Sequence, residues 1–234
     1  MKRLFRFALW LLLSIAGTAF AAVPSTIQTT YDIFKLGLKI GQIEEFYRRD
    51  KDRYTLVSTT RAVGFFSLFK SGKVIVRSSG LIDEQGLRPL VFSAENENND
   101  KDSKHAEFDW AAKKISLTKH NDHSVMNLPE VTQDRLSAMY QFMFLPLQSP
   151  TLDFQMLNGS YLLNYRFDIT QGTLIKTPAG EFATLYLDNK AQGAKERTEL
   201  WLARQYFNLP CKMIITAPDG GKLTQILRIL DVSP

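Results

Sequence analysis

Most of the chain alternates apolar and polar residues at every second position, the pattern of a β-strand with one buried and one solvated face. The alternation is plainest at residues 105–110, 114–118 and 163–170. Further runs rich in Val, Ile, Thr and aromatic residues are typical of strands; they lie at 26–34, 42–49, 54–63, 74–81, 90–97, 183–187, 198–203, 209–217 and 223–230. Turn-forming residues between the runs predict a continuous antiparallel meander that ends in a hairpin around residues 218–221.

One segment, residues 129–146, has the period of a helix instead. Its apolar side chains recur at i, i+3, i+4, i+7 and i+8; they are Leu136, Met139, Tyr140, Met143 and Phe144. Thr132 is expected to cap the N-terminus, and Asp134 in the first turn suits the positive end of the helix dipole. Pro146 should end the helix. Because strand-like sequence lies on both sides, this amphipathic helix is predicted to pack across a curved sheet.

The N-terminus, residues 1–21, has the organisation of a cleaved signal peptide. A basic start is followed by an apolar stretch and by the A-x-A cleavage site Ala19-Phe20-Ala21. The alternative is an uncleaved anchor, but the apolar stretch falls short of the ~20 residues that cross a bilayer. We therefore expect export to the periplasm, cleavage after Ala21, a single domain over residues 22–234, and no transmembrane segment after cleavage.

Charge and cysteine content narrow the class of partner. Three of the 29 Lys and Arg residues lie in the expected signal, so the mature chain carries a net charge of only +2. A near-neutral chain with mixed charges argues against nucleic acid as the partner. Cys211 is the single cysteine, which excludes an internal disulfide. We expect a buried, inert thiol, with a reactive or intermolecular thiol as the alternative.

No catalytic signature stands out in the sequence. His120 and His123 have no third metal ligand at a recognised spacing, so they are expected on a solvated turn. Phosphate-binding glycine loops and a GxSxG elbow are absent, although a Ser/His/Asp assembly built in space stays open. Glu44 and Glu45 should point to opposite faces of a strand as ordinary surface charge. The sequence therefore predicts a non-enzymatic protein without metal or cofactor.

Two groups of residues are candidates for binding. Arg135 either joins Asp134 in capping and a salt bridge, or positions an acidic ligand group at the rim of a cavity. The helix face of Leu136, Met139, Tyr140, Met143 and Phe144 is either plain core or an adaptable apolar wall for a ligand. A second group either packs against the sheet or forms an exposed loop for a membrane or a partner; it comprises Phe65, Phe66, Leu68 and Phe69.

Several short motifs in order along the chain resemble an exported bacterial family known as domain-of-unknown-function family 3108. They are Lys39-Ile40-Gly41, Asp134-Arg135-Leu136-Ser137-Ala138-Met139-Tyr140, Lys176-Thr177-Pro178-Ala179-Gly180-Glu181-Phe182, Trp201-Leu202-Ala203 and Asn208-Leu209-Pro210. The resemblance covers nearly the whole mature chain, with Cys211 as one departure. It implies the periplasmic lipoprotein-carrier-like fold: a mainly β, strongly curved antiparallel sheet, an unclosed barrel, wrapped around helical structure and able to enclose an apolar cavity. Known carriers use more than one helix, whereas this chain has one clear helix.

Three hypotheses for the function follow. The leading one is a periplasmic protein that holds a hydrophobic ligand, a lipid or an envelope protein segment, between the helix and a sheet lined by residues such as Phe108, Trp110, Tyr165 and Phe167. The alternative is an interaction or structural module for envelope assembly that uses a sheet edge or the loop at 65–69. A hydrolase or lyase would require Asp134, Arg135 and a histidine to meet in one pocket. The oligomeric state stays open.

Overall fold

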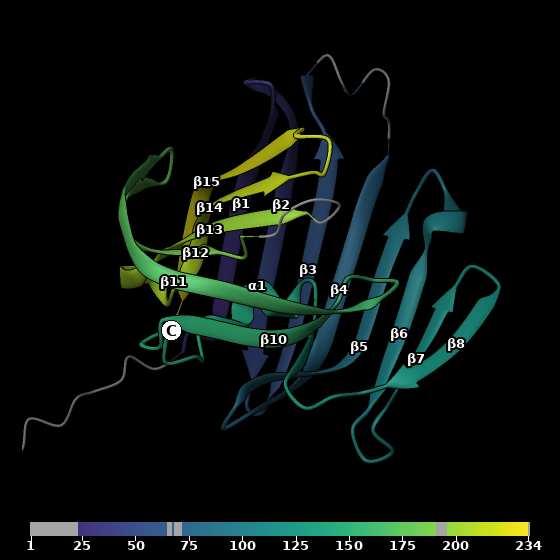
Figure 1. Cartoon of the computed structure of the whole chain (residues 1–234). Helices are drawn as coiled ribbons and strands as arrows, with labels where there is room; N and C mark the ends of the chain where they lie inside the picture. Colours follow the sequence, from purple (N-terminus) through teal and green to yellow (C-terminus); the bar gives the residue numbers. More distant parts are fainter. Residues whose placement is uncertain (1–22, 65–66, 68–71, 191–195, 234) are drawn as a thin grey trace, which may run out of the picture.

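The computed structural model describes residues 23–64, 67, 72–190 and 196–233 (Figure 1). The expected signal peptide, residues 1–21, lies outside the described residues. So do Phe65, Phe66, Leu68 and Phe69, the proposed partner or membrane loop.

The described residues form one 15-stranded sheet in the order β8-β7-β6-β5-β4-β3-β2-β1-β15-β14-β13-β12-β11-β10-β9. The first and last strands pair antiparallel at its centre, from Thr26 opposite Ser233 to Lys35 opposite Leu223. From β1 the chain runs outward, strand by strand, to β8 at one edge of the sheet. It then crosses to β9 at the other edge and returns, strand by strand, to β15 beside β1. In chain order the strands are β1 (Thr26–Lys35), β2 (Leu38–Asp50), β3 (Arg53–Ala62), β4 (Lys73–Asp83), β5 (Gly86–Asn96), β6 (Lys104–Asp109), β7 (Lys114–Lys119), β8 (Asp122–Asn127), β9 (Thr132–Asp134), β10 (Thr151–Leu157), β11 (Leu162–Thr177), β12 (Gly180–Asp188), β13 (Arg197–Ala203), β14 (Leu209–Thr216) and β15 (Lys222–Ser233).

The sheet curves strongly, and its two ends approach each other without closing. The end strands β8 and β9 are separated in the chain only by residues 128–131, and β9 lies beside β5. In Figure 1 the short helix α1 (Ser137–Gln141) lies between β10 and β11 at the front and β2–β4 at the back. The predicted curved, unclosed antiparallel sheet with one helix packed across it is therefore confirmed for the described residues, with the parallel pair of β9 and β10 as a departure.

The predicted helix is much shorter than its sequence period indicated. Thr132, the expected N-cap, lies in β9, which runs parallel to residues 155–157 of β10, and its hydroxyl donates to the Pro129 carbonyl. The prediction was wrong here because pairing with a strand distant in sequence overrides the local helical pattern. Asp134 still acts at the helix start: its Oδ1 accepts the backbone N–H groups of Leu136 and Ser137 at 2.8 and 2.9 Å.

The helix joins two apolar clusters. Leu136 and Tyr140 pack into a cluster formed mainly by the first seven strands, with Leu157 of β10 and Leu209 of β14. Ala138 and Phe142 pack into a cluster formed by β10–β13. Met139 contacts both clusters. A five-residue helix is not stable alone, so its position depends on these contacts.

The start of one strand and the presence of another also differ from the sequence pattern. Residues 38–41, expected in a loop, belong to β2, so that the turn is confined to Leu36 and Gly37. The edge strand β8 was not anticipated, because it is exposed on both faces over most of its length and has no buried face to impose an apolar alternation.

Candidate functional site

A cavity of about 460 Å³ lies between α1 and the curved sheet. This volume falls within the range of small-molecule sites, roughly 300–1,000 Å³. Most of its wall is apolar, contributed by Ile43, Val76, Leu136, Met139, Phe154, Met156, Tyr165, Phe167, Pro210, Met213 and Ile215. Both halves of the sheet and the helix contribute, so the cavity exists only when the barrel is assembled.

The structure brings four of the six predicted ligand-contacting residues to this cavity. Arg135, Leu136, Met139 and Tyr140 line it, whereas Met143 and Phe144 pack against the apolar cluster of the first seven strands and do not reach it.

The aromatic residues that were expected to line one concave surface are similarly divided. Tyr165 and Phe167 line the cavity. Phe108 and Trp110 border a separate hollow, and the Trp110 indole donates to the Pro89 carbonyl at 2.7 Å. The aromatic side chains of the cavity wall therefore include Phe154 on β10 and Tyr165 and Phe167 on β11, but none from β6.

The cavity contains a carboxylate that sequence reasoning had assigned to the surface. Glu45 lies in the cavity wall, where Ser58 Oγ donates to its Oε1 and Tyr140 OH to its Oε2, both at 3.1 Å. Burial raises the pKa of Glu45, and the hydrogen bonds from Ser58 and Tyr140 and the charge of Arg135 only partly oppose this effect. One signal could have found it: Glu45 has the same parity on β2 as Ile43 and the buried Tyr47.

Arg135 stands at the rim of the cavity. The residue is partly open to solvent and also borders a smaller hollow of about 190 Å³ next to Lys104 and Asn158. Burial by surrounding protein lowers the pKa of the guanidinium, against the attraction of Asp134 and Glu45. Asp134 is engaged elsewhere, because besides capping the helix it accepts a 2.5 Å hydrogen bond from Ser78 Oγ. The two residues therefore have different roles: Asp134 caps the start of α1, and Arg135 lines the two cavities.

Two glutamines, Gln133 on β9 and Gln141 on α1, form hydrogen bonds to the start of β5 and the turn before it. The Leu87 N–H donates to Gln141 Oε1 and the Leu87 carbonyl accepts from Gln133 Nε2, both at 2.7 Å, while Gln141 Nε2 donates to the Gln85 carbonyl at 2.6 Å. Because β6 pairs with β5 only over residues 91–94, these amides replace a missing neighbour strand at the start of β5. Sequence reasoning missed this clamp, since isolated glutamines carry no periodic signal.

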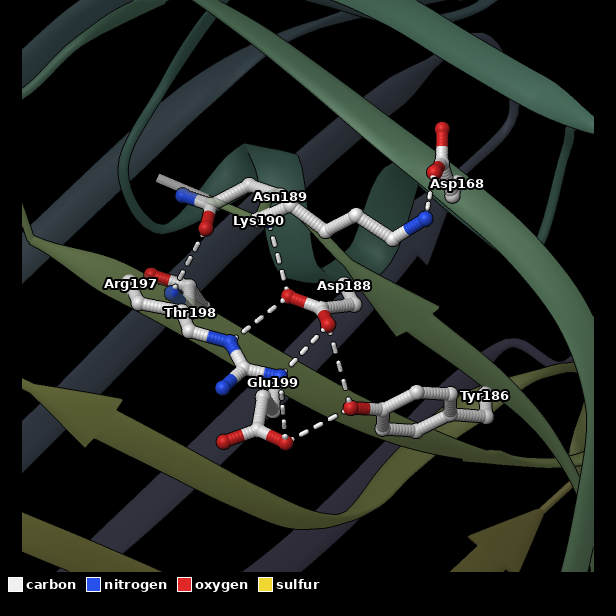
Figure 2. Close-up of polar contacts among 8 residues, drawn as sticks. All are labelled: Asp168, Tyr186, Asp188, Asn189, Lys190, Arg197, Thr198 and Glu199. Carbon is white, nitrogen blue, oxygen red and sulfur yellow. Dashed lines mark hydrogen bonds and ion pairs between the residues drawn. The ribbon is translucent and has the colours of Figure 1, made fainter. Parts of the chain in front are cut away.

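A second polar cluster lies on β11–β13 (Figure 2). Arg197 donates to both oxygens of the buried Asp188 at 3.0 and 2.6 Å, and Tyr186 OH donates to Glu199 at 2.6 Å. Burial alone would raise the pKa of Asp188, but the hydrogen bonds from Arg197 and from a backbone N–H lower it overall. Since its charged groups satisfy one another, we assign this cluster a structural role in joining β12 to β13.

The remaining candidate groups lie away from the cavity. Among the described residues the cavity wall includes no histidine, and His123 instead contacts Thr118 Oγ1 at 3.0 Å on the exposed edge hairpin. The assembly of Asp134, Arg135 and a histidine that a hydrolase would require is not formed. Cys211 is buried, which raises the pKa of its thiol to about 12.

In the part of the chain that the structure describes, no group of three or more His, Cys, Asp or Glu side chains could hold a metal ion. No helix there has both the length and the apolar character needed to cross a membrane.

The fold and the cavity together define a β-barrel-like protein whose interior is roofed by a single short helix. A crystal structure of a β-barrel-like protein of domain of unknown function DUF1849 from Brucella abortus is similar, with a TM-score of 0.58, 9% identity, and coverage of 90% of this chain and 98% of that one. A protein with a YmcC-like fold from Bacteroides fragilis matches with a TM-score of 0.32 and 9% identity over 89% of this chain and 96% of that one. No curated protein matches the sequence.

Residues 26–228 match the family model described as "Protein of unknown function (DUF3108)", and the chain belongs to that family. The family resemblance inferred from the sequence is therefore confirmed. Neither the family description nor the similar structures name a catalytic activity.

Proposed function

We propose that the protein is a non-enzymatic binding protein that holds a hydrophobic ligand in the cavity beneath α1. The observation that carries this proposal is the cavity itself, about 460 Å³ with a mostly apolar wall. Met139, Met156 and Met213 contribute to three of its sides, from the helix, β10 and β14. Methionine side chains are flexible and polarisable, so such a wall adapts to acyl chains of different shape.

The polar groups of the cavity support binding better than catalysis. Glu45 is the cavity carboxylate with a raised pKa, yet both of its oxygens accept hydrogen bonds from neighbouring hydroxyls. These bonds hold it in place and anchor Tyr140 of the roof. A general acid or base must exchange a proton with a substrate atom, whereas the contacts of Glu45 join it to Ser58 and Tyr140 within the wall.

The site of action that we propose is the periplasm, on the strength of the signal-like sequence at residues 1–21. Fractionation of cells that produce the full chain should place the protein in the periplasmic extract. N-terminal sequencing should begin at Ala22. A cytoplasmic protein that retains Met1 would refute this part of the proposal.

The free sheet edge supports the alternative, a partner-binding module, less well. Of the described strands, β8 lies at one end of the sheet, and Val125 on it is 67% exposed. The strand is short, however, and begins with Asp122 and His123. Short, polar edge strands are a common protection against pairing with another chain.

The direct test is native mass spectrometry and lipid extraction of protein purified from the periplasm. We expect the wild type to carry lipid, and Met213→Trp, which places a larger side chain in the cavity, to carry much less. Val125→Trp on the exposed edge is the matched control and should retain the wild-type amount. Thermal unfolding of all three proteins checks that they are folded.

The proposal fails if the folded wild-type protein neither retains lipid nor binds an added acyl chain. It also fails if Met213→Trp carries as much lipid as the wild type, because the ligand would then lie elsewhere.

A further inference from the structure

Two cations border the space where the two ends of the sheet approach each other. Arg135 follows β9 at one end, and Lys104 begins β6 near the other. Both line the 190 Å³ hollow, and Arg135 and Asn158 also line the large cavity. The two spaces therefore adjoin at Arg135 and Asn158.

Lys104 reaches across this gap to the turn between β10 and β11. A Cβ atom added at Gly159 would lie 3.2 Å from Lys104 Cδ and 3.5 Å from its Nζ, so the ammonium group rests against this turn. Burial, then the positive charges of Lys119 and Arg135, lower the pKa of Lys104, and the charge of Asp102 only partly opposes this effect. The two cations are thus close enough to repel each other across the hollow.

Two acidic residues, Glu95 and Asp102, also line the hollow, and each has another hydrogen-bond partner. Glu95 pairs with Arg77 at 2.9 Å, and Asp102 accepts from Asn99 Nδ2 at 2.8 Å. Within the described part of the chain, the ion pairs of the structure include neither Lys104 nor Arg135. Two neighbouring cations whose side chains form none of these ion pairs can together bind an anion.

Asn158 adds an uncharged donor at the same place. Its Oδ1 already accepts the backbone N–H groups of Ser160 and Tyr161 at 3.1 and 3.0 Å. The side-chain amide is therefore held by the turn, and its Nδ2 remains a donor at the junction of the two spaces.

We infer that the ligand is an anionic amphiphile whose apolar tail lies beneath α1 and whose carboxylate or phosphate head lies between Arg135 and Lys104, beside the Asn158 amide. This inference rests on the proposed function and specifies the class of its ligand. Other acids, Glu45 and Glu196, line the large cavity. They disfavour an anionic head deep inside the large cavity, whereas in the smaller hollow the charges of Arg135 and Lys104 offset those of Glu95 and Asp102.

The test is isothermal titration calorimetry at pH 8 on the delipidated mature chain. The probes are dodecanoate, dodecyl phosphate, dodecanol and dodecylamine, which share one tail and differ in the head. We expect the wild type to bind the better of the two anions about tenfold more tightly than dodecanol, the range of one charge-assisted hydrogen bond. Dodecylamine should bind more weakly than dodecanol.

Variants then locate the head group. Arg135→Gln and Lys104→Gln should each weaken binding of the anion about tenfold, and should weaken binding of dodecanol by a clearly smaller factor. Arg135→Lys, which keeps the charge, should retain most of the preference and guards against a variant that fails to fold. Lys35→Gln, at the exposed end of β1, is the matched loss of one charge and should behave as the wild type.

The outcomes separate the inference from the proposed function. If dodecanol binds as tightly as the anions, or if neither glutamine variant changes anion affinity, the inference is overturned while the apolar cavity keeps its role. If none of the four probes binds, both are overturned.

Discussion

Replacing Gln141 by Leu tests whether a side-chain amide stands in for a missing strand. Leu has nearly the volume of Gln but neither donates nor accepts a hydrogen bond. Gln141 is 5% exposed and Leu87, whose N–H it accepts, is 3% exposed, so water has little access to the donor that is left behind. The variant therefore removes a polar contact without opening a large cavity.

The magnitude follows from the two bonds that are lost. A buried N–H left without a partner costs about 1–3 kcal/mol. The Gln85 carbonyl, which accepts from Gln141 Nε2, belongs to an exposed residue and can bond to water instead, so it adds little. We expect the free energy of unfolding to fall by about 2 kcal/mol.

Urea denaturation followed by tryptophan fluorescence measures this loss, and hydrogen exchange should show faster exchange of the Leu87 amide. Gln148→Leu changes an exposed glutamine in the loop between α1 and β10, and should stay within about 0.5 kcal/mol of the wild type. Equal stabilities of Gln141→Leu and Gln148→Leu, with Leu87 exchange unchanged, would refute the clamp.

Three further predictions concern neighbouring features. Gly86→Ala should cost about 1–3 kcal/mol in urea denaturation, since φ is +103° and the new Cβ would lie 2.5 Å from Gln141 Oε1; an unchanged midpoint would contradict this. Burial raises the pKa of Glu45 in the folded protein, so ionisation of Glu45 opposes folding as pH rises above 4.5. Glu45→Gln removes this effect and should therefore have a higher free energy of unfolding than the wild type above pH 4.5. Denaturation between pH 4 and 8 measures the difference, which should vanish at the acid end. Arg197→Gln should cost about 1–3 kcal/mol at pH 7 by removing a charged partner of Asp188. Because the folded pKa of Asp188 is lowered, that cost should shrink as pH falls below 3.8, and a cost that is independent of pH would argue against the pair.

Local pattern was enough to find most of the sheet. In a strand, successive side chains point to opposite faces, so the alternation at residues 105–110 and 163–170 reports directly on which positions are buried. The terminal hairpin and the curved, antiparallel-dominated sheet followed from the same information. The strand β8 was not predicted because both of its faces are exposed, so its sequence has no apolar alternation.

The helix boundaries and the cavity depended on contacts between residues far apart in the chain. Thr132 has a helical context, but the backbone of β9 pairs with β10, and that pairing decides its conformation. Parity along β2 could have placed Glu45 inward. By contrast, the approach of Arg135 to Lys104 results from the curvature of fifteen strands, to which each strand adds a small twist. The sequence by itself therefore determined which faces are apolar, and the tertiary structure alone decided which charges meet at the gap, because that gap exists only once the whole sheet has curled.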